Sequence, residues 1–564
     1  MHAANHTPLS PLRFLERSAA VFPDKTAIEH GARRYTYAEF GAEAQRLAKA
    51  LAARIKPGDR VAFLAPNVPE LLIAHFAVPL AGGVLVALNT RLAAHEVKYI
   101  LEHSEAALLF ADAELLATVD GVADLGGAAA EVPVIVVPDS EARDSEARDA
   151  AATGAREASG AVVRGAEHGQ RELYADLLTG APDGPDLVWG VDDEQTPITL
   201  NYTSGTTGKP KGVLYSHRGA YLNALGESHH QGFDGDTRYL WTLPMFHCNG
   251  WCTPWAVTAA AGTHVCLRAV RADAVWAALD DGVTHLCGAP TVCSIIADAE
   301  QAHTLTPQGA AAPLKITTAG APPSPTIIRR LSDLGVTVVH VYGLTEVYGP
   351  YTICEYQPAW DSLSADERAA KLSRQGVGMV QAETARIVEI GTVGDLVDVP
   401  ADGDTIGEIV LRGNNVMLGY YRDPEATERA FAGGWFHTGD LGVMHPDGYI
   451  QLKDRAKDIV ISGGENISTI EVEQAIVSHP DVLDVAVIGV PDERWGERPV
   501  AFVVRARASD LAAEELAAHV RGLIAGFKVP REIHFTDELP KTSTGKTLKH
   551  ELRALAALAA EGAR

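Results

Sequence analysis

Hydrophobic and polar positions follow two alternating patterns through the first part of the chain. Short apolar runs at residues 61–65 and 84–88 have the length of buried strands. Apolar residues recur at helical spacing in segments such as 37–55. Because strand and helix patterns follow one another, the sequence predicts a large α/β body with helices on the faces of a sheet.

From about Gly407, strand and turn patterns replace this alternation. The tripeptide at 446–448, Pro-Asp-Gly, marks a tight hairpin and predicts a small β-rich layer. The tripeptide at 438–440, Thr-Gly-Asp, predicts a tight turn that carries a carboxylate. The segment from Ser468 to Glu471 predicts a capping box that opens a helix. Strand-like runs with helices between them then favour a small α+β domain.

These changes of pattern predict two domains, residues 1–454 and residues 455–564, with a boundary near 453–458. Within the first domain, residues 139–170 are rich in Ala, Glu, Arg, Asp and Gly and repeat the pentapeptide SEARD in tandem. Such a segment buries too little apolar surface to order itself. We therefore expect a low-complexity, exposed insertion that carries no chemistry.

The composition narrows the class of protein. At 564 residues the chain exceeds what one hydrophobic core usually supports, and its net charge of −25 argues against nucleic acid or an anionic membrane as the main partner. All six cysteines lie between Cys248 and Cys354 without a C-x-x-C pair, which is typical of reduced thiols. No apolar run reaches membrane-spanning length. We expect a cytoplasmic protein with no stable membrane insertion.

The strongest chemical signal is a loop of small residues, hydroxyls and lysines around residue 205. Small residues let backbone N–H groups approach phosphate oxygens, hydroxyls add donors, and lysines offset the charge of a triphosphate. The loop is not a Walker A motif, because Thr203 stands where that motif needs glycine. A flexible loop without a ligand is the alternative. The candidate phosphate-binding residues are Thr203, Ser204, Gly205, Thr206, Thr207, Gly208, Lys209 and Lys211.

Three further segments suit a nucleotide. The segment from Tyr342 to Glu346 combines an aromatic ring, a hydroxyl and a carboxylate, which suit base stacking, phosphate contact and Mg²⁺ binding. Asp440 offers a carboxylate to ribose hydroxyls. Lys546 ends a small-residue loop like that of Walker A, but Pro540 stands in place of the first glycine. Taken singly, each residue would be an ordinary surface or turn residue.

Together and in this order, the segments resemble the adenylate-forming superfamily of acyl-CoA synthetases, firefly-type luciferases and peptide-synthetase adenylation domains. The resemblance runs from about Leu12 to the end, interrupted by 139–170. It implies an α/β fold in which the large N-terminal domain has two sheet subdomains and a small β-rich layer, and the small C-terminal α+β domain is mobile. It implies an ATP-dependent acyl-CoA ligase that forms acyl-AMP and pyrophosphate, and then acyl-CoA and AMP.

The resemblance also assigns roles to residues. It implies that Lys546 bridges the substrate carboxylate and the α-phosphate, and that Thr345 and Glu346 hold the α-phosphate and Mg²⁺, with Thr207 as a second metal ligand. Lys457 matches the hinge position. The adenine and ribose would be bound by Gly320, Ala321, Pro322, Tyr342, Gly343, Asp440 and Arg455. The coenzyme A arm would pass Gly463, Gly464 and Glu465.

For the acid, the segment from Leu243 to Trp251 matches the family segment that borders the acyl pocket, where His247 would gate the tunnel and act in catalysis. Bulky Trp251 would shorten the pocket, although a core tryptophan is the alternative. The resemblance therefore favours a short- to medium-chain aliphatic acid, including methylthio-substituted propionate. The candidate pocket residues are His247, Asn249, Trp251, Gly288, Ala289 and Gly349.

Two other functions stay open at this point. The chain would load an acyl carrier protein if its acceptor were a carrier domain in trans. A nucleotide-binding pseudoenzyme is a second alternative, but it predicts loss of charged residues that are all present here. The expected small-molecule partners are ATP, coenzyme A and a small carboxylic acid, with a homodimer and a lysine acetyltransferase acting on Lys546 as candidate protein partners.

Overall fold

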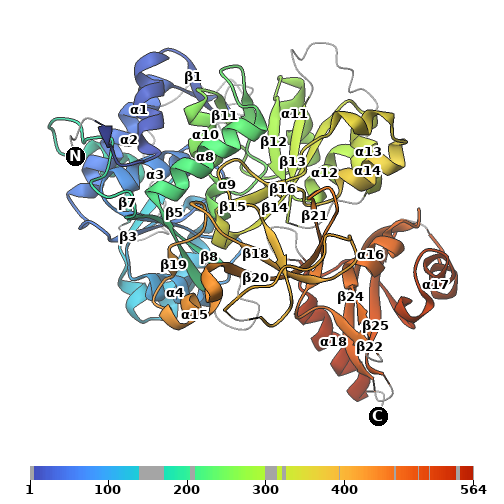
Figure 1. The fold of residues 1–564 in the computed structure, drawn as a ribbon. Helices are drawn as coiled ribbons and strands as arrows, with labels where there is room; N and C mark the ends of the chain where they lie inside the picture. Colours follow the sequence, from blue (N-terminus) through green and yellow to red (C-terminus); the bar gives the residue numbers. More distant parts are fainter. Residues whose placement is uncertain are drawn as a thin grey trace, which may run out of the picture.

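In the residues that it describes, the computed structural model has four β-sheets, arranged in a large body and a smaller C-terminal part (Figure 1). The structure describes residues 5–138, 171–203, 210–298, 314–320, 325–392, 394–462, 465–492, 495–506, 509–541 and 547–562. The predicted insertion at 139–170 lies outside these residues.

The first large sheet is mostly parallel and has the order β16-β15-β14-β13-β12-β10-β11-β1-β2. The central strands β1, β11, β10, β12, β13 and β14 pair with one another in parallel. Antiparallel strands extend the sheet at both ends, β2 beside β1, and β15 and β16 beyond β14. The strands are β1 (Thr26–His30), β2 (Arg33–Thr36), β10 (Arg238–Leu240), β11 (Thr263–Val265), β12 (His285–Gly288), β13 (Lys315–Thr318), β14 (Thr337–Leu344), β15 (Gly349–Ile353) and β16 (Val377–Gly378).

The second large sheet has the order β19-β9-β8-β4-β3-β5-β6-β7. The apolar runs predicted as strands form β3 and β4, whose residues are almost all buried. The strands are β3 (Arg60–Leu64), β4 (Val84–Ala87), β5 (Ala106–Asp112), β6 (Val134–Val137), β7 (Glu172–Leu173), β8 (Pro197–Thr203), β9 (Lys211–Ser216) and β19 (Gly419–Tyr420).

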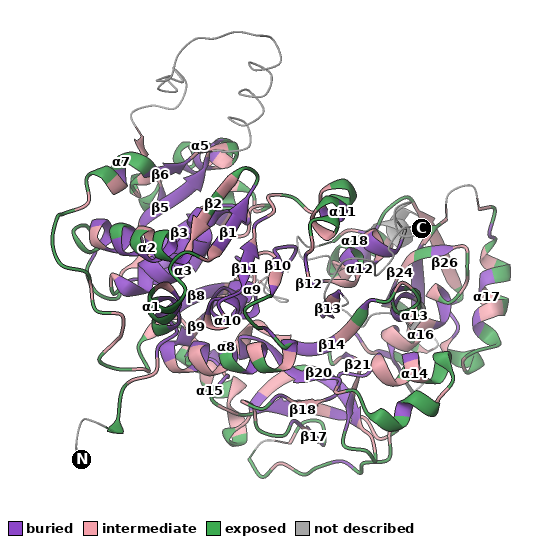
Figure 2. Ribbon diagram, turned by 90° about the horizontal axis from the view of Figure 1, so that it is seen from above, coloured by how far each residue is buried: buried purple, intermediate pink, exposed green. Residues whose placement is uncertain are grey.

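One hydrophobic core joins both large sheets, because it contains Ile28 of β1, Phe63 of β3 and Val213 of β9 together with side chains of the helices packed on them. Figure 2 shows the strands of this body largely buried. The helices of the body are α1 (Leu12–Val21), α2 (Tyr37–Ala52), α3 (Pro69–Leu80), α4 (Ala94–Ser104), α5 (Leu116–Asp124), α7 (Tyr174–Thr179), α8 (His217–Gln231), α9 (Cys248–Trp251), α10 (Thr253–Ala259), α11 (Ala272–Asp280), α12 (Pro290–Asp298), α13 (Pro325–Asp333), α14 (Ala365–Leu372) and α15 (Pro424–Ala430). Its 3₁₀ turns are η2 (Ala113–Leu115), η3 (Ala128–Glu131), η5 (Thr345–Val347), η6 (Pro358–Ser362) and η7 (Ala432–Gly434).

A four-stranded antiparallel sheet, β17-β18-β20-β21, forms the predicted β-rich layer. The predicted hairpin at 446–448 joins β20 to β21. The predicted turn at 438–440 is wrong, since these residues lie inside β20, where Gly439 adopts a φ of +70° without ending the strand. The strands are β17 (Arg386–Val388), β18 (Gly407–Leu411), β20 (Phe436–Met444) and β21 (Ile450–Arg455).

Residues from Val460 onward form a fourth sheet, β23-β22-β25-β24 with β26 beside β25, and have hydrophobic clusters of their own. The predicted fold class is confirmed, although the division at 454/455 stays a prediction. The elements are β22 (Val460–Ser462), β23 (Glu465–Ile467), α16 (Thr469–Val477), β24 (Val482–Asp492), β25 (Gly496–Arg505), α17 (Ala513–Arg521), η8 (Gly526–Lys528), β26 (Glu532–Thr536) and α18 (Lys549–Gly562).

Half of the predicted capping box is present at the start of α16. Ser468 accepts a hydrogen bond from the Glu471 backbone N–H at 3.1 Å, as predicted. The Glu471 carboxylate instead accepts two hydrogen bonds of 2.7 Å from Lys528. The helix therefore begins where the sequence predicts, but its acidic residue is held by an ion pair.

Candidate active site

The candidate site lies at the carboxyl ends of the parallel strands β12, β13 and β14. Gly288 ends β12 and pairs with Thr318 of β13, and Thr318 pairs with His340 of β14. The predicted residues Gly288, Gly320 and Thr345 therefore follow neighbouring strands at one edge of the sheet. This edge is where open α/β sheets usually bind ligands.

The ends of the predicted phosphate loop are fixed by a β-hairpin. Thr203 of β8 pairs with Lys211 of β9 across the loop. The loop residues Ser204, Gly205, Thr206, Thr207, Gly208 and Lys209 lie outside the described residues, so their roles stay predictions. The Lys211 ammonium lies 4.5 Å from the centre of the Tyr420 ring, which places a cation at the base of the loop.

Tyr420 connects this loop base to the predicted metal-binding carboxylate. Its hydroxyl donates a 2.9 Å hydrogen bond to Oε1 of Glu346. Burial raises the pKa of Glu346, while the hydrogen bond from Tyr420 acts in the opposite direction. Sequence reasoning missed Tyr420, because it lies 74 residues after Glu346 and no local motif marks it.

A second pair of predicted residues is brought together by the β20–β21 hairpin. Asp440 and Arg455 are directly opposite each other in the ladder, and Arg455 Nε lies 3.2 Å from Asp440 Oδ1. The other carboxylate oxygen, Oδ2, accepts a 2.8 Å hydrogen bond from the Tyr342 hydroxyl. Tyr342, Asp440 and Arg455 thus form one connected group, as a shared nucleotide site requires.

Two glycines of the predicted site meet at the β14–β15 hairpin. A Cβ built on Gly343 would lie 1.7 Å from the Gly349 carbonyl oxygen. A Cβ built on Gly349 would lie 2.7 Å from Cδ1 of Trp251, and Gly349 has a φ of +106°. Both positions therefore require glycine, and Trp251 packs directly on Gly349.

Residues 248–252 form a left-handed turn that presents Trp251 to this hairpin. Their φ angles lie between +50° and +64°, and only Gly250 is a glycine. A left-handed conformation costs roughly 1–2 kcal/mol for each non-glycine residue, so other contacts hold the turn. Beside the turn, half-buried His247 precedes Cys248, whose Sγ donates to Thr345 Oγ1 at 3.3 Å.

Asn249 has a different environment from the one expected of a pocket wall. Its side chain is fully buried, and its Oδ1 accepts hydrogen bonds from Thr199 Oγ1 at 2.8 Å and Asn201 Nδ2 at 2.9 Å. Its Nδ2 lies 3.2 Å from Nε2 of His75. The amide is thus engaged inside the core.

The remaining predicted residues are dispersed or lie outside the described part of the chain. Lys457 lies in an exposed turn after β21, and half-buried Ala289 follows β12. Ala321, Pro322, Gly463, Gly464 and Lys546 lie outside the described residues, as does the side chain of Glu465. No group of three or more metal-ligating side chains occurs in the described part, so a metal there would depend on substrate oxygens as well.

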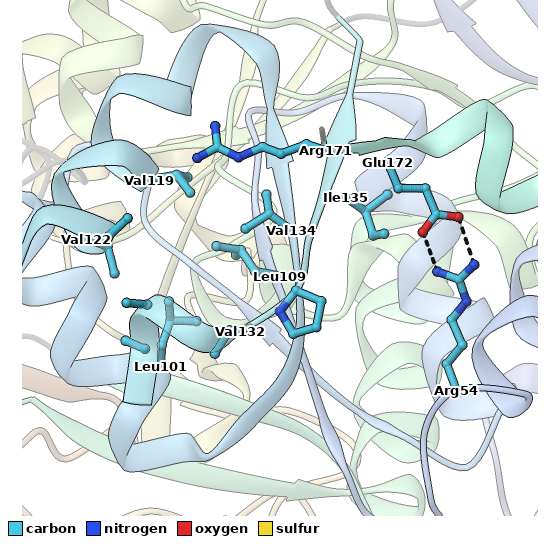
Figure 3. Close-up of a pocket in the computed structure, with 14 residues that line it drawn as sticks. Arg54, Leu101, Leu109, Val119, Val122, Val132, Val134, Ile135, Arg171 and Glu172 are labelled. Atoms are coloured by element: carbon cyan, nitrogen blue, oxygen red, sulfur yellow. Dashed lines mark hydrogen bonds and ion pairs between the residues drawn. The ribbon is translucent and has the colours of Figure 1, made fainter. Parts of the chain in front are cut away.

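A separate hollow of about 370 Å³ lies beside β5 and β6 (Figure 3). It is lined mainly by aliphatic side chains, and at its side Arg54 binds Glu172 through two hydrogen bonds of 2.6 and 2.8 Å. None of the predicted site residues lines it. The hollow therefore belongs to neither the nucleotide group nor the Trp251 turn.

The sequence matches two family models. Residues 15–421 match the model of the AMP-binding enzyme, and residues 471–546 match that of the AMP-binding enzyme C-terminal domain. None of the helices in the described ranges is long and apolar enough to cross a membrane.

Several curated proteins are similar along nearly their whole length. An acetate–CoA ligase of Humulus lupulus is 44% identical over 572 residues, covering 98% of this chain and 96% of its own. A peroxisomal acetate/butyrate–CoA ligase of Arabidopsis thaliana is 42% identical, with 98% and 95% covered. A 2-methylpropanoate–CoA ligase of Humulus lupulus is 41% identical, with 98% and 96% covered. Because one of these names places its protein in peroxisomes, the predicted cytoplasmic location stays a prediction.

Two solved structures have the same architecture. MatB of Rhodopseudomonas palustris with ATP bound superposes with a TM-score of 0.76 at 28% identity, covering 96% of this chain and 98% of its own. The anthranilate CoA ligase AuaEII in complex with anthranoyl-AMP superposes with a TM-score of 0.83 at 23% identity, covering 100% of both chains, and is evidence for the fold alone.

Proposed function

The chain belongs to the AMP-binding enzyme family and is an acid–CoA ligase, and from this premise we propose that it activates a short-chain aliphatic acid through an acyl-adenylate. The observation that carries the proposal is the packing of Trp251 on Gly349, in the same turn whose Cys248 donates to Thr345. A bulky indole in this place limits the length of the acid. The acetate, butyrate and 2-methylpropanoate named for the relatives are acids of this size.

The chemistry of adenylation explains the kinds of residue in the site. An ionised carboxylate is already a nucleophile and needs no general base, but it must approach an anionic phosphorus. Catalysis therefore requires cations and aligned donors in place of a proton acceptor. Among the residues that the structure describes, Lys211 and Arg455 supply cations. Lys209 and Lys546 would add two more.

Magnesium suits the oxygen donors of the site. Mg²⁺ usually binds one or two carboxylates together with substrate phosphates. The half-buried carboxylate of Glu346 next to Thr345 fits that requirement, with Thr207 as the predicted second ligand. Bound there, the ion would offset the charge of the triphosphate.

In the second step the thiol of coenzyme A attacks the acyl-AMP carbonyl, and AMP leaves. We propose that rotation of the C-terminal part near Lys457 lets one pocket serve both steps, presenting Lys546 first and the loop at Gly463 second. The alternative acceptor is a carrier protein. It differs from the main proposal only in what receives the acyl group.

The test is a rate measurement with MgATP, coenzyme A and straight-chain acids from acetate to dodecanoate, with benzoate and methylthiopropionate added. AMP and acyl-CoA are measured together. We expect equal amounts of both, with the highest kcat/KM among acids of two to six carbons. Pyrophosphate release without acyl-CoA would redirect the search to a pantetheinylated carrier protein, and no acid-dependent pyrophosphate release would contradict the proposal.

A further inference from the structure

The left-handed turn at residues 248–252 is held from one side by a buried histidine of another helix. His75 lies on α3 and is fully buried. Its Nδ1 lies 2.8 Å from the Leu71 carbonyl oxygen, and its Nε2 lies 3.2 Å from Nδ2 of Asn249. The histidine therefore lies between its own helix and the turn.

The hydrogen-bond partners determine which ring nitrogen carries the proton. A carbonyl oxygen can only accept, so Nδ1 of His75 carries the hydrogen and Nε2 is the acceptor. Asn249 must then point its NH₂ group at His75, and this agrees with its Oδ1 accepting from Thr199 and Asn201. Each of these four hydrogen bonds then has one donor and one acceptor. Burial lowers the pKa of His75 to about 4, which keeps the ring neutral.

His75 also contacts the helix that follows the turn. Its carbonyl oxygen accepts a 3.1 Å hydrogen bond from Nε1 of Trp255 on α10, and the two rings meet edge to face with centroids 5.7 Å apart. The turn is thus tied to His75 on both sides of Trp251, by Asn249 before it and by Trp255 after it.

We propose that His75 is a positioning residue that sets the acid specificity of the enzyme, because it holds Asn249 in the left-handed turn and thereby keeps Trp251 against Gly349. The inference rests on the proposed function. It changes the expected role of Asn249 from a pocket wall to the link between His75 and the wall.

Without the acceptor on residue 75, the turn loses one of the bonds that offset its backbone strain. Relaxation of residues 248–252 would withdraw the indole of Trp251 from Gly349 and lengthen the pocket. In the described part of the chain, the hydrogen bond and the ion pair that connect Tyr342, Asp440 and Arg455 do not involve His75, so ATP binding should change little.

The experiment compares His75→Leu with His75→Gln, whose amide oxygen can replace Nε2 as acceptor. For each we would measure kcat/KM for acetate, butyrate and hexanoate, the KM for ATP and the thermal midpoint. We expect His75→Leu to raise the ratio of hexanoate to acetate at least tenfold with the KM for ATP within twofold. His75→Gln should restore the ratio to within threefold of the unmodified enzyme. Exposed His229 on α8 offers a matched control, His229→Leu.

A second variant keeps the test decisive if His75→Leu does not fold. Asn249→Gly keeps a residue that adopts positive φ freely but removes the amide, so we expect the same shift toward hexanoate. An unchanged ratio of hexanoate to acetate in either variant would overturn the inference. So would an equal loss of catalytic efficiency with all three acids and with ATP. Absence of acyl-CoA formation by the unmodified enzyme would refute the proposed function itself, and the inference with it.

Discussion

The hydroxyl of Tyr342 donates a 2.8 Å hydrogen bond to Oδ2 of Asp440, 98 residues further along the chain. Because Arg455 contacts the other oxygen, the carboxylate is oriented from two sides and keeps free lone pairs for a ligand. This is the arrangement expected of a residue that accepts from the two hydroxyls of a ribose.

We therefore expect Asp440→Ala to weaken ATP binding. Hydrogen bonds to a charged group contribute about 1.5–3 kcal/mol each, which corresponds to a loss of roughly tenfold to a hundredfold in kcat/KM for ATP. Tyr342→Phe removes only one orienting bond and should cost less. Steady-state kinetics with varied ATP measure both, and an unchanged kcat/KM for ATP in Asp440→Ala would contradict the assignment.

Lys546→Ala should abolish adenylation and leave thioester formation from supplied acyl-AMP largely intact, because the predicted ammonium acts only on the carboxylate and the α-phosphate. The two half-reactions are measured by pyrophosphate release and by acyl-CoA formation. Lys541→Ala is a matched control in the same segment, since Lys541 forms an ion pair with Asp484 at 2.5 Å. Equal loss of both half-reactions would refute the role of Lys546.

Trp251→Leu should move the preferred acid to greater chain length, because the smaller side chain leaves space against Gly349. We expect kcat/KM for octanoate relative to butyrate to rise about tenfold, which corresponds to roughly 1.4 kcal/mol of differential binding. Trp360→Leu is the control for the loss of a buried tryptophan, because Trp360 lies in a small separate cluster. A chain-length profile that is the same in Trp251→Leu and the unmodified enzyme would place the acyl pocket elsewhere.

The carboxyl group of Glu227 should make the free energy of unfolding depend on pH. It is fully buried on α8, and burial raises its pKa to about 8. Between about pH 4.3 and this value the folded state holds one proton more than the unfolded state, so the free energy of unfolding falls as pH rises, by up to about 1.4 kcal/mol per pH unit. Glu227→Gln removes this dependence.

We therefore expect Glu227→Gln to raise the thermal midpoint more at pH 7.5 than at pH 5.5. Glu425→Gln, at an exposed position, should leave the thermal midpoint almost unchanged at both pH values. Equal effects of Glu227→Gln at the two pH values would mean that Glu227 titrates normally.

Local patterns predicted the elements of this fold more reliably than the environment of single residues. The apolar runs that became β3 and β4 have the length of buried strands and are shorter than most helices. Asp440 shows where such reasoning fails, because the Gly439 beside it accepts a left-handed φ inside a strand as readily as in a turn. The capping box at Ser468 formed only in part, because a distant lysine, Lys528, binds the acidic residue.

The candidate site was predictable where a motif is contiguous and not where it depends on long-range contacts. Thr345 and Glu346 follow a strand in sequence, so their place at the sheet edge could be expected. Tyr420 and His75 reach the site through tertiary packing, from segments 74 and 174 residues away from their partners. Neither has a spacing that marks it, and only the folded chain brings them to the site.

All six cysteines are buried and none forms a disulfide. Four of them lie in the hydrophobic core that contains Trp251, and Cys293 and Cys354 lie in two smaller clusters. A thiol reagent in water can reach each cysteine only when the cluster around it opens, since the thiolate must first become accessible. The native protein should therefore react slowly with such a reagent, and the labelling rate at each cysteine would measure how often its own cluster opens. The cysteines of the unmodified protein can therefore report local opening without an added probe.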